Sequence, residues 1–165
     1  GHFPTEHEST GAPASAKAPA GKPSHLRTSH PRKLPFPMHL TVLAAVVERD
    51  DAFLLTRRLA GTHLAGMWEF PGGKCEAGET HEACLQRELM EELGVDAVIG
   101  DVVFEIIHAY PEKTVELHFR ACTLTGEPVP QIGQQMRWVP RAELKSLEFP
   151  EADRELIELL TTAAR

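Results

Sequence analysis

Residues 72–95, GGKCEAGETHEACLQRELMEELGV, constrain the fold more than any other stretch of the chain. Thr80 is a candidate N-cap and Gly94 is a natural stop, so the sequence predicts a helix between them. The apolar residues expected to face a core along this helix are Ala83, Cys84, Leu85, Leu89 and Leu93. An apolar stripe of this kind indicates a helix that packs against a larger element.

Short apolar segments on both sides of this helix predict strands. Residues 40–48 form a mostly apolar run, typical of a strand covered on both faces. Residues 52–58 return after a turn at residues 49–51, which predicts a hairpin. Further strands are predicted at residues 95–111, 114–124 and 135–140.

A second helix is predicted near the end of the printed sequence. Residues 151–164 place apolar side chains at helical spacing, with acidic side chains opposite. These apolar residues are Leu156, Ile157, Leu159 and Leu160. The order of strands and helices predicts an α/β fold, a mixed sheet with helices packed against it.

The first 37 residues have a different composition from the rest. They hold seven of the 13 prolines, among Ala, Ser, Thr, His and Lys. Such a segment buries too little apolar surface to offset its ordering entropy, so we expect a disordered tail at 1–37 and a folded domain at 38–165. A targeting or docking role for the tail is the alternative to a plain linker.

The charge is unevenly distributed. Residues 1–33 carry five Lys or Arg and two Glu, a charge of +3, and the remainder carries 12 basic and 22 acidic residues, a charge of −10. An acidic body does not favour stable nucleic-acid binding. It also repels a polyphosphate, unless a bound cation reverses the local sign.

The cysteines and the hydropathy limit the cellular locations that fit this chain. Cys75, Cys84 and Cys122 are odd in number and contain no C-x-x-C pair, which argues against a disulfide framework or a zinc site. A reducing, cytoplasmic location fits this pattern best. No apolar run reaches the ~18 residues of a membrane span, and the beginning of the sequence lacks the apolar region of a secretory signal.

Three carboxylates stand close together on the predicted helix. At 100° per residue, Glu91 and Glu92 lie within about 60° of Glu88, one on either side. Oxygen ligands at this density suit a hard cation, Mg²⁺ or Mn²⁺. A solvated acidic face is the alternative, but the turns at residues 72–73 and 78–79 favour a ligand-holding loop.

This stretch resembles the Nudix box, G-x5-E-x7-R-E-U-x-E-E-x-G-U, where U is bulky and aliphatic. Every specified position is filled, by Gly73, Glu79, Arg87, Glu88, Leu89, Glu91, Glu92, Gly94 and Val95. The resemblance extends over residues 40–160 and is nearest to the MutT-type branch, which includes 8-oxo-dGTP diphosphatases and CTP-preferring relatives. The stretches LLTRR, WEFPGGK, YPEKTVELHF and LEFPEAD carry it.

The resemblance implies an α/β/α sandwich around a mixed sheet and hydrolysis of a diphosphate linked to another moiety. It implies Glu88, Glu91 and Glu92 as metal ligands, with the Gly73 carbonyl oxygen as a further ligand. Glu91 or Glu92 would also help to deprotonate the attacking water. Arg87 and Glu79 would hold the loop and the ligands in place.

The same resemblance implies substrate-binding residues. Arg58 and Lys74 are candidates for phosphate contact, with ordinary surface cations as the alternative. Asp153 is a candidate to read the base, and its alternative role is a helix N-cap. In MutT-like 8-oxo-dGTP enzymes an Asn matches this position, whereas CTP-preferring relatives tend to show Asp. Candidates to stack on the base, each equally compatible with a core role, are Phe70, Trp68, Tyr110 and Phe149.

One position departs from the MutT-type pattern. Relatives can carry a further carboxylate just before the Trp of the strand that matches residues 135–140, and here Arg137 precedes Trp138. Glu116 is a weak substitute and reads better as a surface residue. A catalytic carboxylate outside the box therefore stays unassigned.

The resulting functional hypothesis is a Mg²⁺- or Mn²⁺-dependent hydrolase of oxidised or non-standard (d)NTPs, which releases a monophosphate and pyrophosphate. Its partner would be a small nucleotide, without stable nucleic-acid or membrane binding, and the protein would be a monomer or homodimer. The alternatives are a pyrophosphatase of CTP or dCTP derivatives, a hydrolase of ADP-ribose or dinucleoside polyphosphates, and a non-catalytic nucleotide-binding module.

Overall fold

The computed structural model describes residues 38–162, so the predicted tail at 1–37 and the last three residues lie outside the described part. The strands are β1 (Met38–Val46), β2 (Glu48–Arg49), β3 (Ala52–Arg57), β4 (Trp68–Glu69), β5 (Gly72–Lys74), β6 (Ala97–Ala109), β7 (Lys113–Leu124) and β8 (Met136–Pro140). The helices are α1 (His81–Leu93), α2 (Arg154–Thr162) and two 3₁₀ turns, η1 (Arg141–Ser146) and η2 (Glu151–Asp153). None of the helices described is long and apolar enough to cross a membrane.

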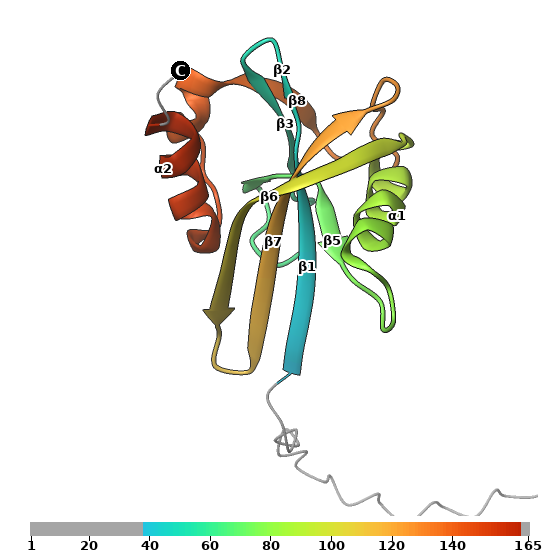
Figure 1. The fold of residues 1–165 in the computed structure, drawn as a ribbon. Helices are drawn as coiled ribbons and strands as arrows, with labels where there is room; N and C mark the ends of the chain where they lie inside the picture. The colour runs from blue at the N-terminus through green and yellow to red at the C-terminus, as the bar shows by residue number, and fades with distance from the viewer. Residues whose placement is uncertain (1–37, 163–165) are drawn as a thin grey trace, which may run out of the picture. The chain divides into compact units, whose positions relative to one another are not determined.

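Two four-stranded sheets form the centre of this part of the chain (Figure 1). The first has the order β5-β1-β7-β6 and is mixed, because β1 pairs with β7 in parallel while β5–β1 and β6–β7 pair antiparallel. The second is antiparallel, with β3 pairing with β2, β4 and β8. The predicted mixed sheet is confirmed, and a second sheet accompanies it.

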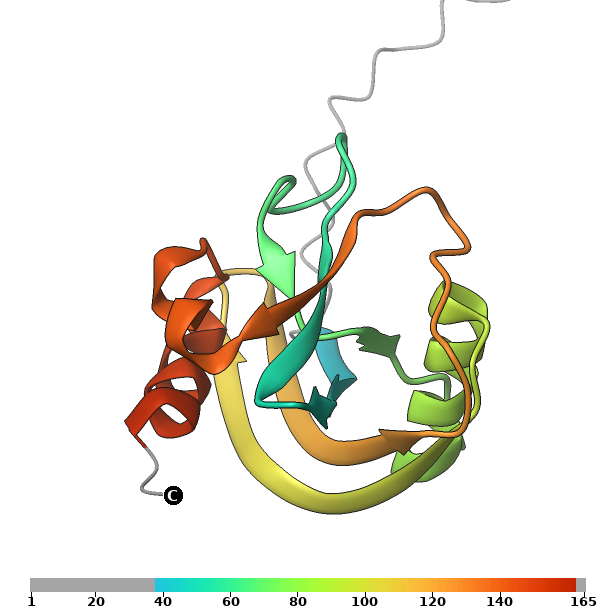
Figure 2. The same cartoon turned by 90° about the horizontal axis from the view of Figure 1, so that it is seen from above.

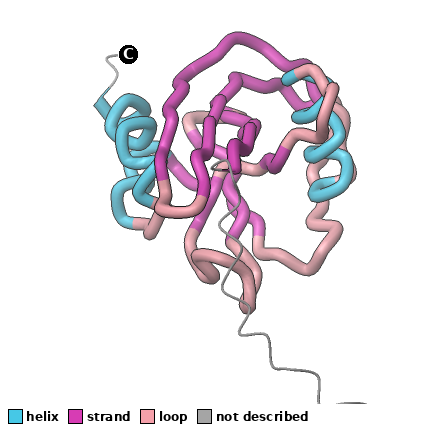
Figure 3. Tube along the Cα trace, turned by 90° about the horizontal axis from the view of Figure 1, so that it is seen from below, coloured by secondary structure: helices cyan, strands magenta, loops and turns pink. Residues whose placement is uncertain are grey.

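The two helices lie on opposite sides of the strands, as Figures 1 and 3 show. Strand β1 packs against side chains on both of its faces, because successive side chains of a strand point to opposite faces. Leu43 and Ala45 pack in the cluster with α1, whereas Ala44 and Val46 pack in the cluster with α2. The predicted α/β/α sandwich is therefore confirmed.

Strand β6 is the longest strand and contributes to both clusters. Its first part places Ala97 and Ile99 with α1, and its later part places Phe104 and Ile106 with α2. Register shifts against β7 lie between Ile99 and Phe104. Irregularities of this kind bend a strand, and β6 curves around the sheet in Figure 2.

Local sequence signals set the bounds of α1. The Thr80 hydroxyl accepts a hydrogen bond from the Ala83 backbone N–H, and Gly94 ends the helix in the left-handed conformation, with φ 59°. Cys84, Leu85, Leu89 and Leu93 are buried as predicted. The prediction for Ala83 was wrong, because it lies in the exposed first turn beside the cap.

The hairpin predicted at residues 49–51 has a two-residue turn. Asp50 and Asp51 both have positive φ, 51° and 61°, which is the backbone of a turn that matches the twist of paired strands. The Asp51 carboxylate accepts a hydrogen bond from Arg141 at 2.8 Å. This contact ties the turn to η1.

The argument against disulfides needs correction, because Cys75 and Cys84 are joined by a disulfide. Cys75 directly follows β5 and Cys84 lies in α1, with 5.2 Å between their Cα atoms. The pair is nine residues apart and matches no short spacing motif, so only the packing of the loop on the helix brings the sulfurs together. Cys122 is buried and unpaired.

Helix α2 offers a matched test of this packing. Leu156 is fully buried, whereas Leu159 is 44% exposed, which contradicts its predicted core position. Leu156→Ala should lower the free energy of unfolding by about 2–5 kcal/mol, through lost burial and the cavity left behind. Leu159→Ala should change it by no more than about 0.5 kcal/mol.

Denaturant unfolding of the two variants and the wild type measures both values. An equal loss of stability in the two variants would contradict the described packing of α2.

Candidate active site

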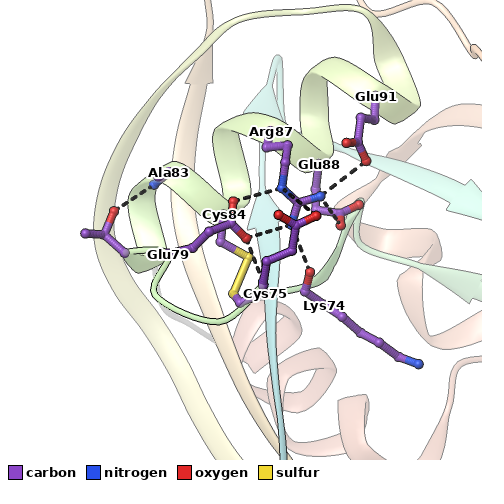
Figure 4. A network of polar contacts seen from close by, with 10 residues as sticks. Lys74, Cys75, Glu79, Ala83, Cys84, Arg87, Glu88 and Glu91 are labelled. Atoms are coloured by element: carbon purple, nitrogen blue, oxygen red, sulfur yellow. Dashed lines mark hydrogen bonds and ion pairs between the residues drawn. A yellow bond between two sulfur atoms is a disulfide. The ribbon is translucent and has the colours of Figure 1, made fainter.

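Arg87 is the centre of a polar network between β5, the loop that follows it, and α1 (Figure 4). Its guanidinium donates to both carboxylate oxygens of Glu79 at 2.8 Å and to the Lys74 carbonyl oxygen at 3.0 Å. It also donates to Glu88 at 2.9 Å and to Glu91 at 3.3 Å. One cation therefore joins the loop after β5 to the acidic face of α1.

The Arg87–Glu79 pair is a bidentate ion pair, the strongest geometry for these groups. The hydrogen bonds from Arg87 and from the Glu76 backbone N–H lower the pKa of Glu79 to about 2. The hydrogen bonds from Arg87 to Glu79 and Glu88 raise the pKa of Arg87. Glu79 therefore stays ionised and keeps the loop folded against α1.

Gly73 and Glu88 are in direct contact across the space between β5 and α1. A Cβ added to Gly73 would lie 2.4 Å from the carboxyl carbon of Glu88. No side chain fits there without moving the carboxylate. The absence of a side chain thus lets the backbone of β5 approach Glu88, whose side chain is only 13% exposed.

Glu92, Glu69 and Asp153 form a second group of acids, on the inner side of the site. Burial raises the pKa of Glu92 to about 8, with the charges of Glu69 and Glu88 adding to the effect. Burial and the charge of Glu69 raise the pKa of Asp153 to about 7. Burial also raises the pKa of Glu69 itself, although Arg58 opposes this shift. These acids would accept nearby positive charge.

A cavity of about 280 Å³ connects these groups. Its wall includes Gly73 and Glu92 from the box, Phe70 from the core and Asp153 from η2. Other predicted site residues on its wall are Arg58, Lys74 and Tyr110. A smaller cavity of about 170 Å³ shares Arg58, Glu69 and Glu92 with it. Predicted residues from distant parts of the sequence thus line one space.

Arg58 is held in place from two directions. Its guanidinium donates to Glu69 at 2.8 Å and to the His63 carbonyl oxygen at 2.5 Å. The side chain is therefore fixed at the boundary of the two cavities. Lys74 by contrast is exposed at the rim of the larger cavity. Its contact with Arg87 is made by its backbone carbonyl oxygen and not by its side chain.

Some candidates lie away from the larger cavity. Trp68 is buried in the core, and Phe149 packs on Phe70 with ring centroids 5.9 Å apart. Glu116 contacts His118 at 2.5 Å and His39 at 3.0 Å. Its neighbours along β7, Val115 and Leu117, line the cavity, so Glu116 points to the opposite face of the sheet. The residues that line the larger cavity therefore do not include Trp68, Phe149 or Glu116.

The helix geometry predicts that the carboxylates of Glu88, Glu91 and Glu92 converge on one point. In the structure they do not. Glu88 and Glu91 turn toward Arg87, and Glu92 accepts a hydrogen bond from the Gly72 N–H at 3.4 Å. Within residues 38–162, no three His, Cys, Asp or Glu side chains are arranged as a formed metal site. Arg87 thus binds two of the three carboxylates, and a backbone N–H binds the third.

The donor set nevertheless fits a hard divalent cation. Carboxylate oxygens from one helix face and a backbone carbonyl are the ligands that Mg²⁺ and Mn²⁺ prefer. Gly73 lies in close contact with the Glu88 carboxylate. Burial, with the charges of Glu69 and Glu88, raises the pKa of Glu92, and a bound cation would oppose this shift.

A family model described as NUDIX domain matches residues 42–159. The chain belongs to the Nudix family. Hydrolases of this family generally use a divalent metal ion, which agrees with the donor set of this Nudix protein. The family match includes α1 and the strands around the larger cavity.

Curated relatives cover most of this Nudix domain. It is 37% identical over 123 residues to the 8-oxo-dGTP diphosphatase of Haemophilus influenzae, covering 73% of this chain and 90% of the relative. It is 34% identical over 120 residues to the CTP pyrophosphohydrolase of Escherichia coli K12, covering 72% of this chain and 89% of the relative.

Solved structures share the fold of this Nudix domain. The E. coli ORF135 protein superposes with a TM-score of 0.66 at 34% identity, covering 73% of this chain and 87% of that one. A MutT structure from work on Aliivibrio salmonicida and Vibrio cholerae superposes with a TM-score of 0.65 at 28% identity, covering 74% and 97% of the two chains.

The sequence reasoning missed three residues of this Nudix site. Glu69 borders both cavities and bonds Arg58, and its signal was a lone charge between two apolar anchors in WEFPGGK. The buried Gln134 donates to the Glu92 carbonyl oxygen at 2.8 Å. His63 acts through its backbone oxygen, which no sequence pattern identifies.

The raised pKa of Asp153 predicts a pH dependence of stability. An acid whose pKa rises from 3.8 to about 7 on folding binds its proton more tightly in the folded state. The free energy of unfolding should therefore fall between about pH 4 and pH 7, by up to about 4 kcal/mol from this group. Asp153→Asn should remove this part of the slope.

Denaturant unfolding in EDTA at pH 4, 5.5, 7 and 8 measures the slope, with the exposed Asp101→Asn as the matched control. An unchanged slope in Asp153→Asn would contradict the described burial of this carboxyl.

Proposed function

We propose that this Nudix protein is a Mg²⁺-dependent nucleoside triphosphate pyrophosphohydrolase that acts on oxidised or other non-standard (d)NTPs. The leading substrate is 8-oxo-dGTP, cleaved to a monophosphate and pyrophosphate. The observation that carries the proposal is the single cavity that joins Gly73 and Glu92 to Phe70 and Asp153. Such a cavity would bind the phosphates and the base of one nucleotide together.

The carboxylates of Glu88, Glu91 and Glu92 and the carbonyl oxygen of Gly73 would hold the cation. When bound, Mg²⁺ supplies charge neutralisation at the phosphate oxygens and a more acidic water. The carboxylate of Glu91 or Glu92 would take the proton of the attacking water. Loss of that proton to a nearby base strengthens the nucleophile.

The remaining box residues would position these groups. Arg87 holds Glu88 and the Lys74 carbonyl, so it would keep β5 and α1 at a fixed separation. Arg58, fixed by Glu69 and His63, would present its guanidinium to phosphate oxygens. Lys74, at the rim, would add a mobile positive charge.

Asp153 would read the base. Its carboxyl is 6% exposed and borders the cavity, and its pKa of about 7 allows it to donate a hydrogen bond when protonated or only to accept when ionised. Phe70 forms part of the same wall. Paired polar contacts with a base edge would give selectivity.

A cytosine nucleotide is the second candidate substrate. The observation that favours it is Asp rather than Asn at position 153, together with the 34% identity to a CTP pyrophosphohydrolase. ADP-ribose, dinucleoside polyphosphates and non-catalytic binding are the remaining alternatives, and the same experiment separates them.

Glu92→Gln should lower kcat on the best (d)NTP by about a hundredfold or more, because metal-ion catalysis supplies several kcal/mol. Glu82→Gln, an exposed residue on the same helix, should leave kcat unchanged. The measurement is pyrophosphate release with Mg²⁺ from 8-oxo-dGTP, dGTP, CTP, dCTP, ADP-ribose and a dinucleoside polyphosphate.

Unchanged turnover in Glu92→Gln would show that α1 does not hold the catalytic metal. Hydrolysis of ADP-ribose alone would replace the proposed substrate class, and binding without any turnover would favour the non-catalytic module.

Asp153→Asn should shift the ratio of kcat/KM for 8-oxo-dGTP and CTP toward 8-oxo-dGTP by about tenfold, because an amide always offers both a donor and an acceptor. The wild-type ratio should change across pH 7, and that of the variant should not. Steady-state kinetics at pH 6, 7 and 8 measure both effects, and a pH-independent ratio in the wild type would exclude this role.

A further inference from the structure

The Cys75–Cys84 disulfide links the same two segments that meet at the contact between Gly73 and Glu88. Cys75 lies two residues after Gly73 on the same stretch of chain, and Cys84 lies one helical turn before Glu88. Residues four apart share one helix face, and here Glu88 faces Gly73 in β5 while Cys84 faces Cys75, the residue after β5. Figure 4 shows the disulfide beside the Arg87 network.

The disulfide therefore restrains the same separation on which the candidate metal ligands depend. A Cβ on Gly73 would lie 2.4 Å from the carboxyl carbon of Glu88, so a side chain at this position would displace the carboxylate. A covalent link one turn away fixes the position of the strand relative to the helix.

The loop does not depend on the disulfide for its fold. The Cys75 N–H donates to the Thr41 carbonyl oxygen at 2.9 Å, and Arg87 holds both Glu79 and the Lys74 carbonyl. The Glu76 N–H donates to Glu79 at 2.7 Å. Reduction would remove one restraint among several, so both redox states would remain folded and differ in rigidity.

The two sulfurs differ in access. Cys84 is fully buried, whereas Cys75 is partly exposed at the edge of the loop. A small reagent would reach the sulfur of Cys75 first. Cys122, the third cysteine, is 7% exposed and unpaired, so it offers an internal control.

We propose that Cys75 and Cys84 form a reversible redox modification site that tightens divalent-cation binding when it is oxidised. The cation part of this inference rests on the proposed function. Disulfides of proteins in reducing compartments are usually transient and redox-sensing. The oxidant would be hydrogen peroxide or a small disulfide, and the reductant would be a dithiol.

With peroxide, the Cys75 thiolate attacks one oxygen and the O–O bond breaks, which gives a sulfenic acid and one water after protonation. The Cys84 sulfur then attacks the Cys75 sulfur, the S–O bond breaks and a second water leaves. Two thiols are oxidised and one peroxide is reduced. A dithiol reverses the reaction by attack on Cys75, release of the Cys84 thiol, and closure of its own disulfide.

The test compares wild type, Cys75→Ala and Cys122→Ala after peroxide and after dithiothreitol. Alkylation of the denatured wild type should find one free thiol after oxidation and three after reduction, since the chain has three cysteines. The Tm of wild type and Cys122→Ala should fall by about 5–10 °C on reduction, as expected for a short closed loop. The Tm of Cys75→Ala should not respond.

Mn²⁺ binding, followed by electron paramagnetic resonance without nucleotide, measures the functional effect. Reduction of wild type and Cys122→Ala should raise the dissociation constant by about tenfold, the lower range for loss of a restraint around metal ligands. Cys75→Ala should bind like reduced wild type in both treatments.

Four outcomes would overturn the proposal. Three free thiols after peroxide would exclude the oxidised state, and one free thiol after dithiothreitol would make the link permanent. Equal Mn²⁺ affinity in both redox states would exclude the effect on the site, while leaving the proposed function intact. Absence of Mn²⁺ binding in both states would overturn the proposed function as well.

Discussion

The guanidinium of Arg87 is the contact on which the geometry of the site depends. It joins the backbone carbonyl of Lys74, at the end of β5, to Glu79 in the loop and to Glu88 and Glu91 on the helix. The carboxylates that repel one another thus share one fixed cation. This cation contacts both β5 and α1, beside the close approach of Gly73 to Glu88. The disulfide restrains the same two elements by a covalent route.

Buried negative charge is the second constraint. Glu69, Glu92 and Asp153 border one cavity, and burial raises the pKa of each. Arg58 compensates only Glu69 directly. A site with this imbalance would attract divalent ions and, through them, the phosphates of a nucleotide, which the acidic body alone would repel. The fold keeps these acids together because their strands and helices pack in two clusters on opposite sides of β1.

Local signals predicted much of this fold from the sequence. The Thr80 cap, the Gly94 stop and the spacing of Leu85, Leu89 and Leu93 act within one helix, so a sequence window contains all the information. The exposure of Ala83 and Leu159 and the turning of Glu88 toward Arg87 depend on neighbouring groups, which periodicity does not include.

Contacts between distant segments were the ones missed. The role of Glu69 depends on Arg58 from another strand, and that of Gln134 on a carbonyl 42 residues away. The Cys75–Cys84 pair depends on how the loop after β5 folds onto α1. Residue type and spacing do not specify the partners in these contacts, because each contact requires the tertiary arrangement.

Anomalous diffraction from crystals soaked with Mn²⁺ and a non-hydrolysable nucleotide analogue tests the central claim most directly. The account predicts a peak about 2.2 Å from carboxylate oxygens of Glu88 and Glu92 and from the Gly73 carbonyl oxygen. A well-ordered analogue in the cavity with no peak among these ligands would contradict it.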